Sequence, residues 1–245
     1  MSHRRPPRVV SLVPSATETL LAWGVTPVAC TRFCEQPDIP HVGGTKDPDV
    51  DAVVALDPDL VVLCVEENRR EDADALAAAG VTTASLSIDG LADVPNALSM
   101  LAALVGAEAA AARDVTGSAA IVASASDLPA SRVRAFVPIW KRPWMTMSGG
   151  TYGSSLLASI GVANVFRDAV TRYPTVTLDE VRARRPDVVL APSEPYPFAE
   201  RHVPLFDDIA PVVLVDGQDL FWWGARTVGA QARLAAQVAA LGSSG

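Results

Sequence analysis

The sequence is poor in residues that identify several common protein classes. Its 245 residues include three cysteines, none of them in a CxxC pair, and three histidines. An odd number of unpaired cysteines argues against a disulfide framework and favours buried thiols. Cys30, Cys34 and His41 have a loose metal-ligand spacing, but the pattern supplies no fourth ligand for zinc. We therefore expect no metal site and no required cofactor.

Excess basic charge and long apolar runs are also missing. The formal net charge of −8 argues against nucleic acid and anionic lipid as partners, because both require a basic surface. No apolar run reaches the roughly 18 residues that span a bilayer, so no membrane insertion is expected. The N-terminal segment runs into Pro14 without the apolar core of an export signal. As written, the chain is expected to be cytoplasmic. A protein whose leader has been removed would look the same and would be periplasmic or extracellular.

Recognisable groups of catalytic residues are absent as well. His3, His41 and His202 lie in unrelated contexts, and the chain has no HExxH, GxSxG or paired-carboxylate motif. A hydrolase or transferase needs a nucleophile with a base in reach, and no such pair is apparent. The sequence therefore predicts a protein that binds a ligand and is not an enzyme.

What the chain does contain is an internal repeat. Residues 49–66 and 177–194 align with an offset of 128 and share seven of eighteen residues. Between them lies an alanine-rich stretch with Leu and Val at helical spacing, which predicts helix. The chain thus divides into an N-terminal lobe (1–91), a helical bridge (92–130) and a C-terminal lobe (131–245).

Strands and helices are expected to alternate within each lobe. Short apolar runs predict strands at 8–13, 27–30, 60–65, 81–88, 133–140, 188–191 and 212–215, and helical patterns cover 49–56 and 227–241. Ser15-x-x-Glu18 and Thr177-x-x-Glu180 read as capping boxes at helix starts. This alternation predicts an α/β fold of two Rossmann-like lobes with small parallel sheets, joined by one long backbone helix.

Aromatic residues are concentrated in the second lobe. Of fourteen, two precede residue 134, whereas strand ends and loops of the second lobe are expected to carry Trp140, Trp144, Tyr152, Tyr196, Phe198, Trp222 and Trp223. Core packing could explain each of these residues alone. Tryptophans in loops flanked by proline and glycine instead favour an apolar wall for a large planar ligand. In an α/β sheet such a wall belongs at the carboxyl ends of the strands.

Several segments, in this order, resemble one known family. They are RVVSLVPSATETLLAWG, VGGTKDPDVDAVVALDPDLVVL, MSGGTYGSSLLASIGVANVF and the repeated PDVVL. They resemble the helical-backbone (class III) periplasmic-binding-protein family, whose members deliver vitamin B12, ferric siderophores and haem to ABC transporters. The opening VSLVPSATE most resembles the cobalamin-binding branch. The resemblance implies transport without catalysis and a ligand cleft between the two lobes.

The resemblance also implies which residues would meet the ligand. From the first lobe these are Phe33, Gln36, Cys64 and Glu67, and from the second they are Trp144, Ser148, Gly149, Gly150, Tyr152, Tyr196, Trp222, Trp223 and Arg226. Arg226 and the backbone amides of the glycine loop would serve polar groups of the ligand. Cys64 stands where cobalamin binders often carry an aromatic. Glu66 and Glu194 resemble carboxylates that dock each lobe onto arginines of a permease, with an acidic helix start as the alternative reading.

Together these features predict a monomeric binding protein for a corrinoid such as cobalamin, or a related metal chelate. His41 or His202 could reach the cobalt as an axial ligand. The alternatives are a ferric-siderophore or haem binder, and an intracellular enzyme or regulator acting on a tetrapyrrole or other planar metabolite. A strongly shifted pKa in the cleft would favour the enzyme. A cleft filled by its own side chains would favour a protein-interaction module.

Overall fold

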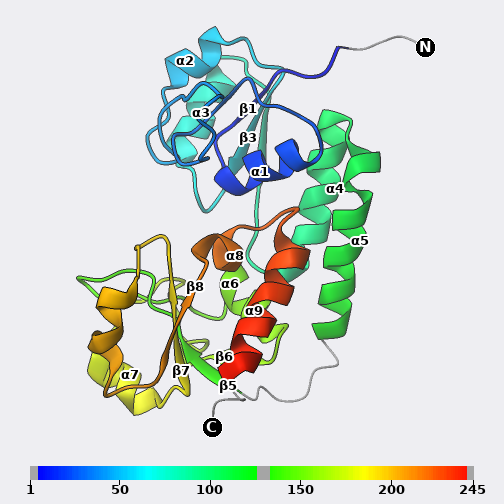
Figure 1. The fold of residues 1–245 in the computed structure, drawn as a ribbon. Coiled ribbons are helices and arrows are strands. Elements are labelled where there is room, and N and C mark those ends of the chain that lie inside the picture. The colour runs from blue at the N-terminus through cyan, green and yellow to red at the C-terminus, as the bar shows by residue number, and fades with distance from the viewer. Residues whose placement is uncertain (1–4, 126–132, 242–245) are drawn as a thin grey trace. The chain divides into compact units, whose positions relative to one another are not determined.

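The computed structural model describes residues 5–125 and 133–241, which form two compact units (Figure 1). The N-terminal unit holds the described residues up to 88 together with 93–116 and 223–225. The C-terminal unit holds 89–92, the described residues from 117 to 222, and those from 226 onward. Each unit contains one parallel sheet, so the predicted two-lobed α/β architecture is confirmed.

The N-terminal unit is built on a four-stranded sheet of order β2-β1-β3-β4. Its elements are β1 (Val9–Ser11), α1 (Pro14–Ala22), β2 (Ala29–Cys30), α2 (Val50–Ala55), β3 (Leu60–Cys64), α3 (Arg70–Ala78) and β4 (Thr83–Leu86). Every residue of β1 and β3 is buried, as expected for parallel strands covered on both faces. Val53 of α2 and Leu76 of α3 pack against these strands and close the core.

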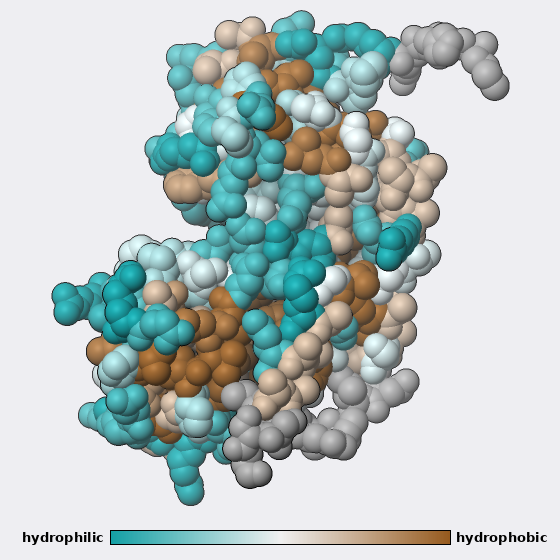
Figure 2. Space-filling view, in the orientation of Figure 1, coloured by the Kyte–Doolittle hydropathy of each residue, from teal (hydrophilic) through white to brown (hydrophobic). Residues whose placement is uncertain are grey.

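The C-terminal unit repeats this plan with the order β6-β5-β7-β8. Its elements are β5 (Val133–Phe136), α6 (Tyr152–Ala158), β6 (Val162–Asn164), α7 (Leu178–Arg184), β7 (Val188–Pro192), the 3-10 helix η2 (Glu200–Phe206), β8 (Val212–Val215), α8 (Gly217–Phe221) and α9 (Thr227–Leu241). Phe136 and Phe206 are fully buried at the centre of its core. Apolar side chains also gather on the face that carries β7 and β8 (Figure 2), where three of the four residues of β8 are only half-buried.

The sequence repeat is a structural repeat. The two sheets have the same parallel strand order, and an aspartate precedes the repeated strand in each. Asp59 Oδ2 accepts the backbone N–H of Arg8 at 2.7 Å, and Asp187 Oδ2 accepts that of Arg134 at the same distance. In both units this bond ties the repeated strand to the first strand of its own sheet.

One of the two predicted capping boxes is confirmed and the other is wrong. Thr177 Oγ1 accepts the Glu180 N–H, and the Glu180 carboxylate accepts the Thr177 N–H. In α1 the N-cap is Val13, because Pro14 takes the first helical position and moves the helix start toward the N-terminus. Ser15 Oγ is consequently buried, and it has no hydrogen-bond partner among the described residues.

The bridging segment differs from the single long helix that the sequence predicted. After the 3-10 turn η1 (Leu91–Asp93), α4 (Val94–Val105) ends at Gly106, which adopts a left-handed φ of 71°. Then α5 (Glu108–Ala125) begins. Glycine adopts this conformation without Cβ strain, so one residue ends a helix that the surrounding alanines would otherwise continue. Residues 126–130 of the predicted bridge lie outside the described residues. Within the described ranges, no helix has the length and apolarity needed to cross a membrane.

Candidate functional site

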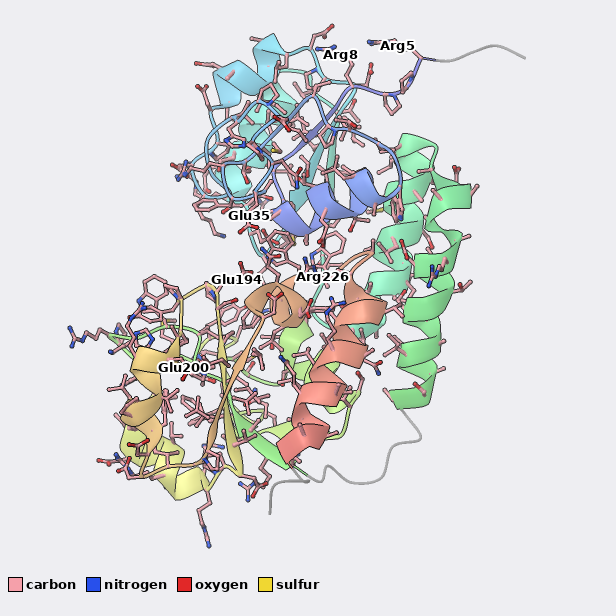
Figure 3. The ribbon with its side chains drawn as sticks, in the orientation of Figure 1. Arg5, Arg8, Glu35, Glu194, Glu200 and Arg226 are labelled. Carbon is pink, nitrogen blue, oxygen red and sulfur yellow. The ribbon has the colours of Figure 1, made fainter. Side chains whose placement is uncertain are left out.

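The loops that follow the strands carry most of the predicted site residues. In the C-terminal unit β5 leads into residues 137–151, β7 leads into 193–199, and β8 leads through Asp216 into α8. These three strands are neighbours in the sheet, so their carboxyl ends lie along one edge. Open parallel sheets bind ligands at this edge. Figure 3 labels Glu194, on the loop after β7, and Arg226, between α8 and α9.

The loops after β5 and β7 meet in a group of rings, which we call the aromatic cluster. Trp140 meets Tyr196 edge-on with ring centroids 5.6 Å apart, and Trp144 stacks on Phe198 at 6.2 Å with the ring planes 8° apart. Tyr196 and Phe198 are 4.7 Å apart. Phe198 is buried, whereas Trp140 is 44% exposed. The cluster thus presents one indole to solvent on a base of packed rings.

His202 fixes the aromatic cluster from inside. The side chain is 5% exposed, its Nδ1 accepts the Ala199 N–H at 3.1 Å, and its Nε2 lies 3.4 Å from the Tyr196 hydroxyl. Burial, and then the charges of Arg201 and Lys141, lower the pKa of His202. Because Nδ1 accepts a hydrogen bond, the proton of the neutral ring is assigned to Nε2. To serve as the axial ligand considered above, His202 would have to give up the Ala199 N–H if it bound through Nδ1, or the contact with Tyr196 if it bound through Nε2.

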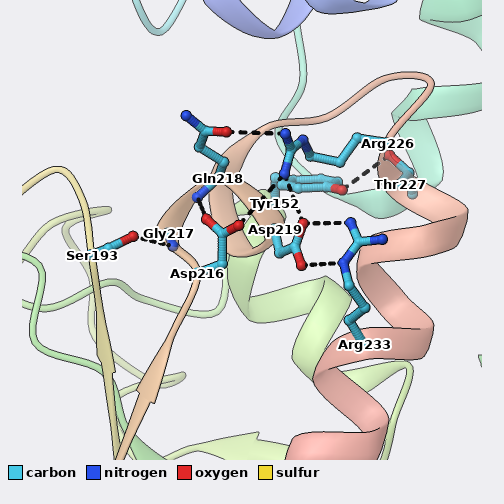
Figure 4. A network of polar contacts seen from close by, with 9 residues as sticks. All are labelled: Tyr152, Ser193, Asp216, Gly217, Gln218, Asp219, Arg226, Thr227 and Arg233. Carbon is cyan, nitrogen blue, oxygen red and sulfur yellow. Dashed lines mark hydrogen bonds and ion pairs between the residues drawn. The ribbon is translucent and has the colours of Figure 1, made fainter.

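A polar network follows β8 (Figure 4). Arg226 donates from Nη1 to Asp219 Oδ1 at 2.7 Å and from Nη2 to Gln218 Oε1 at 3.0 Å. Its guanidinium carbon lies 5.4 Å from the ring centre of Trp222. Arg233 of α9 donates to both oxygens of the same carboxylate, at 2.5 and 2.6 Å. Burial alone would raise the pKa of Asp219, but the hydrogen bonds from Arg233 and Arg226 outweigh it and hold that pKa below its ordinary value.

Tyr152 lies beside this network (Figure 4) and is buried. It is the first residue of α6, and its hydroxyl lies 3.1 Å from Thr227 Oγ1. Burial raises the pKa of Tyr152 well above its ordinary value. In this structure Tyr152 contacts Thr227 at the start of α9, and its predicted contact with a ligand stays a prediction.

The glycine loop before α6 uses its own amides internally. The N–H groups of Ser148 and Gly149 donate to the carbonyl oxygens of Arg172 and Arg167, at 2.7 and 3.1 Å. The Gly150 N–H reaches Ser148 Oγ at 3.3 Å. The sequence suggested that these amides would be open to a ligand, but folding of the loop gives each of them an acceptor.

The N-terminal unit places its predicted residues after β2 and β3. Phe33 is 50% exposed and lies under the guanidinium of Arg32, 4.8 Å from the ring centre. Arg32 is held in turn by Asp47 at 2.9 Å. Cys64 is the last residue of β3 and is buried, and burial raises its pKa to about 12. Glu66 and Glu67 follow in the turn after that strand.

Asn68 is a residue of this unit that sequence reasoning missed. Its Oδ1 accepts the Cys64 N–H at 2.8 Å, and its Nδ2 donates to the carbonyl oxygens of Leu12 and Thr45 at 3.1 and 3.0 Å. One buried amide thereby fastens the end of β3 to the end of β1 and to the long loop. A lone Asn in a polar run gives no sequence signal of this role, and Asp219, which lies within α8, gives no sequence signal of its own role either.

The remaining predicted residues are spread over other parts of the two units. Gln36 lies in the long loop, where its backbone carbonyl oxygen is 3.0 Å from His41 Nε2. Trp223 is buried. It begins the segment 223–225, in which the Ala225 N–H donates to Thr19 Oγ1 at 3.1 Å. The thiols of the loose zinc pattern are buried, and the described residues contain no group of three or more potential metal ligands.

Comparison with known proteins identifies relatives of this arrangement. A family model described as periplasmic binding protein matches residues 9–203. The vitamin B12-binding protein of Salmonella choleraesuis (strain SC-B67) is 27% identical over 191 residues, which cover 75% of this chain and 71% of that protein. The vitamin B12-binding protein of Pectobacterium carotovorum subsp. carotovorum (strain PC1) is 26% identical over 230 residues, which cover 90% of this chain and 83% of that protein.

Solved structures share the fold. The periplasmic vitamin B12-binding protein BtuF of Vibrio cholerae superposes with a TM-score of 0.78 at 18% identity, covering 96% of this chain and 98% of that one. The periplasmic heme-binding protein BhuT in complex with two hemes gives a TM-score of 0.80 at 22% identity with the same coverage. Since similar folds carry different ligands, the fold alone does not select one.

Proposed function

The chain belongs to the periplasmic binding protein family, and from this premise we propose that it is a non-enzymatic, monomeric binding protein for a corrinoid such as cobalamin. The ligand would be delivered to an ABC transporter from the periplasm. Curated relatives that cover most of the chain and are vitamin B12-binding proteins support this choice of ligand.

The exposed indole of Trp140 on the aromatic cluster is the observation that carries the proposal. Trp140 is braced by Tyr196, and Trp144 and Phe198 stack behind it. Because these rings already pack on one another, a planar ligand could stack on Trp140 with little loss of side-chain freedom. Ring pairs of this kind contribute about 0.5–1.5 kcal/mol beyond the apolar area they bury. In the N-terminal unit, Phe33 offers a second half-exposed ring.

At the strand ends, the environment of the potential metal ligands favours a corrinoid over a haem, whereas His41, in the long loop, is exposed. Haem iron in binding proteins is commonly held by an axial His, Cys, Met or Tyr side chain. At the strand ends, Cys64 and Tyr152 are buried, and Tyr196 and His202 contact each other inside the aromatic cluster. A corrinoid can carry both axial ligands of its cobalt with it, so it requires none of these residues. A haem or ferric-siderophore binder is the second candidate, and the same experiment tests it.

We also propose that Glu66 and Glu194 dock the protein onto a permease. The two residues are related by the sequence repeat, and they follow β3 and β7 in the corresponding turns of the two units. Glu66→Ala and Glu194→Ala should leave corrinoid affinity unchanged and reduce ligand-stimulated ATP hydrolysis by the reconstituted transporter. Full stimulation with both variants would contradict the docking role.

Binding is tested by visible absorption spectra and calorimetric titration with cyanocobalamin, cobinamide, hemin and a ferric siderophore. We expect saturable binding of both corrinoids, with each recovered unchanged. Trp140→Ala should weaken corrinoid binding about tenfold, from lost stacking and lost apolar burial. The control is Val170→Ala, a fully exposed position in the same unit. Binding of hemin or the siderophore alone, or equal affinities of wild type and Trp140→Ala, would overturn the proposal.

A further inference from the structure

In the described ion pairs of the polar network around Arg226, positive and negative charges balance. The Nη1 of Arg226 lies 2.7 Å from Asp219 Oδ1 and 3.9 Å from Asp216 Oδ2, and Asp219 also binds Arg233 (Figure 4). Two arginines and two aspartates therefore sum to zero formal charge. A site built to attract an anionic ligand group would normally carry net positive charge. This polar network does not.

The same network holds the guanidinium of Arg226 in one place. Asp219 is 3% exposed and the Arg226 side chain 15% exposed, so their ion pair is largely shielded from water. Gln218 accepts from a second nitrogen of the guanidinium, and the ring of Trp222 lies against it. Charges at this depth act on one another more strongly than exposed charges do. Both the position of Arg226 and its electrostatic field depend on Asp219.

We infer that Asp219 is a specificity-determining positioning residue, which holds Arg226 against Trp222, neutralises it, and so selects a ligand edge of neutral amides over one of carboxylates. A carboxylate placed beside Arg226 would also face the two aspartates at its Nη1, and their repulsion would offset its attraction to the guanidinium. A neutral amide carbonyl meets no such repulsion. The inference rests on the proposed function, and it narrows the ligand class to planar chelates with an amide-rich periphery.

Two probes with the same corrin ring distinguish a preference for amides from a preference for carboxylates. Cobinamide carries amides around the corrin, and cobyrinic acid carries carboxylates at the same positions. The wild-type protein should bind cobinamide more tightly. Asp219→Asn keeps the side-chain shape and raises the charge of the network by one. It should shift the ratio of the two affinities about tenfold toward cobyrinic acid, the size expected for one partly screened charge.

A second variant keeps the test decisive if Asp219→Asn fails to fold, as judged by circular dichroism. Asp216 is half-exposed, and its Oδ1 accepts the Gln218 N–H, an acceptor that Asp216→Asn retains. This variant should shift the ratio in the same direction by a smaller factor. Asp208→Asn is the matched control, because it removes the same charge from an exposed pair with Arg182. It should leave the ratio within about twofold of wild type, since exposed pairs contribute little.

The ratio of the affinities for cobinamide and cobyrinic acid is the informative readout, because a merely structural role of Asp219 would weaken the binding of both ligands alike. An unchanged ratio in both test variants, or a wild-type preference for cobyrinic acid, would overturn the inference while leaving corrinoid binding intact. If the wild-type protein binds neither ring, the proposed function itself fails, and the inference fails with it.

Discussion

Asn68→Asp tests whether one buried amide holds the strand ends of the N-terminal unit together. The substitution keeps the shape of the side chain and the oxygen that accepts from Cys64. It replaces the nitrogen that donates to the carbonyl oxygens of Leu12 and Thr45 by a second carboxylate oxygen. Two donor–acceptor contacts thereby become two repulsive contacts between oxygens, in a position that is almost fully buried.

The loss of folding stability expected for Asn68→Asp is large at neutral pH. Each net hydrogen bond is worth about 0.5–1.5 kcal/mol, and each buried carbonyl left unpaired adds about 1–3 kcal/mol. With two bonds lost and two carbonyls left unpaired, we therefore expect the free energy of unfolding to fall by at least about 3 kcal/mol, out of the roughly 5–15 kcal/mol typical of a domain. Burial and the facing carbonyl oxygens should raise the pKa of the introduced carboxyl above its unfolded value of about 3.9.

This raised pKa gives the variant a characteristic pH dependence. Below the unfolded pKa both states are protonated, and the neutral carboxyl can donate one of the two lost bonds. As pH rises from there through the folded pKa, the unfolded state gives up its proton first and the variant loses stability. Destabilisation relative to wild type should therefore be smallest near pH 4, about the unfolded pKa, and reach its full size above the folded pKa.

Urea unfolding at about pH 4 and about pH 7 measures the effect, and amide exchange of Cys64 reports it locally. The control is Asn96→Asp, an exposed position near the start of α4, which should change stability by less than about 0.5 kcal/mol. A loss below about 1 kcal/mol at neutral pH, or an equal loss at both pH values, would refute the role assigned to Asn68.

Three further perturbations test other parts of the fold. Gly224→Ala should destabilise by more than about 2 kcal/mol in thermal melts, because φ is 128° and a Cβ would lie 2.0 Å from Thr19 Oγ1. Thr177→Ala should cost about 0.5–2 kcal/mol in urea unfolding, because it removes the cap of α7 that pairs with Glu180. The pKa of His202 is lower in the folded state than in the unfolded state, so the stability that His202 contributes is present above the unfolded pKa and is lost as pH falls through the folded pKa. His202→Asn should therefore lessen the loss of stability on acidification, as measured by thermal melts between these two pH values.

Each of these three has a control elsewhere in the chain. Gly80→Ala also places a side chain at positive φ, but with nothing within 4 Å of the new Cβ, so it should cost less than Gly224→Ala. Thr116→Ala changes an exposed threonine within α5, and His41→Asn changes an exposed histidine. Equal costs at the two glycines, a null effect of Thr177→Ala, or equal pH profiles for the two histidine variants would contradict the respective arguments.

The framework of this protein was predictable because its determinants are local. Short apolar runs bounded by turn residues predicted the strands of both sheets except β6, and the repeat marks the same unit twice. Asp59 and Asp187, which the repeat aligns, make equivalent hydrogen bonds in the structure. The prediction fails where one residue overrides a regional tendency: Pro14 moves the start of α1, and Gly106 divides the bridge.

The sequence by itself determined the two α/β lobes, the loops that carry the aromatic residues, and the family to which the chain belongs. The tertiary structure alone decided which rings are exposed, that Tyr152 and Trp223 are buried, and that Asp219 neutralises Arg226. Periodicity and capping act over a few residues, so the sequence displays them directly. Contacts such as those of Asn68 with Leu12 and of Thr19 with Ala225 join residues 56 and 206 positions apart, and only packing brings such groups together.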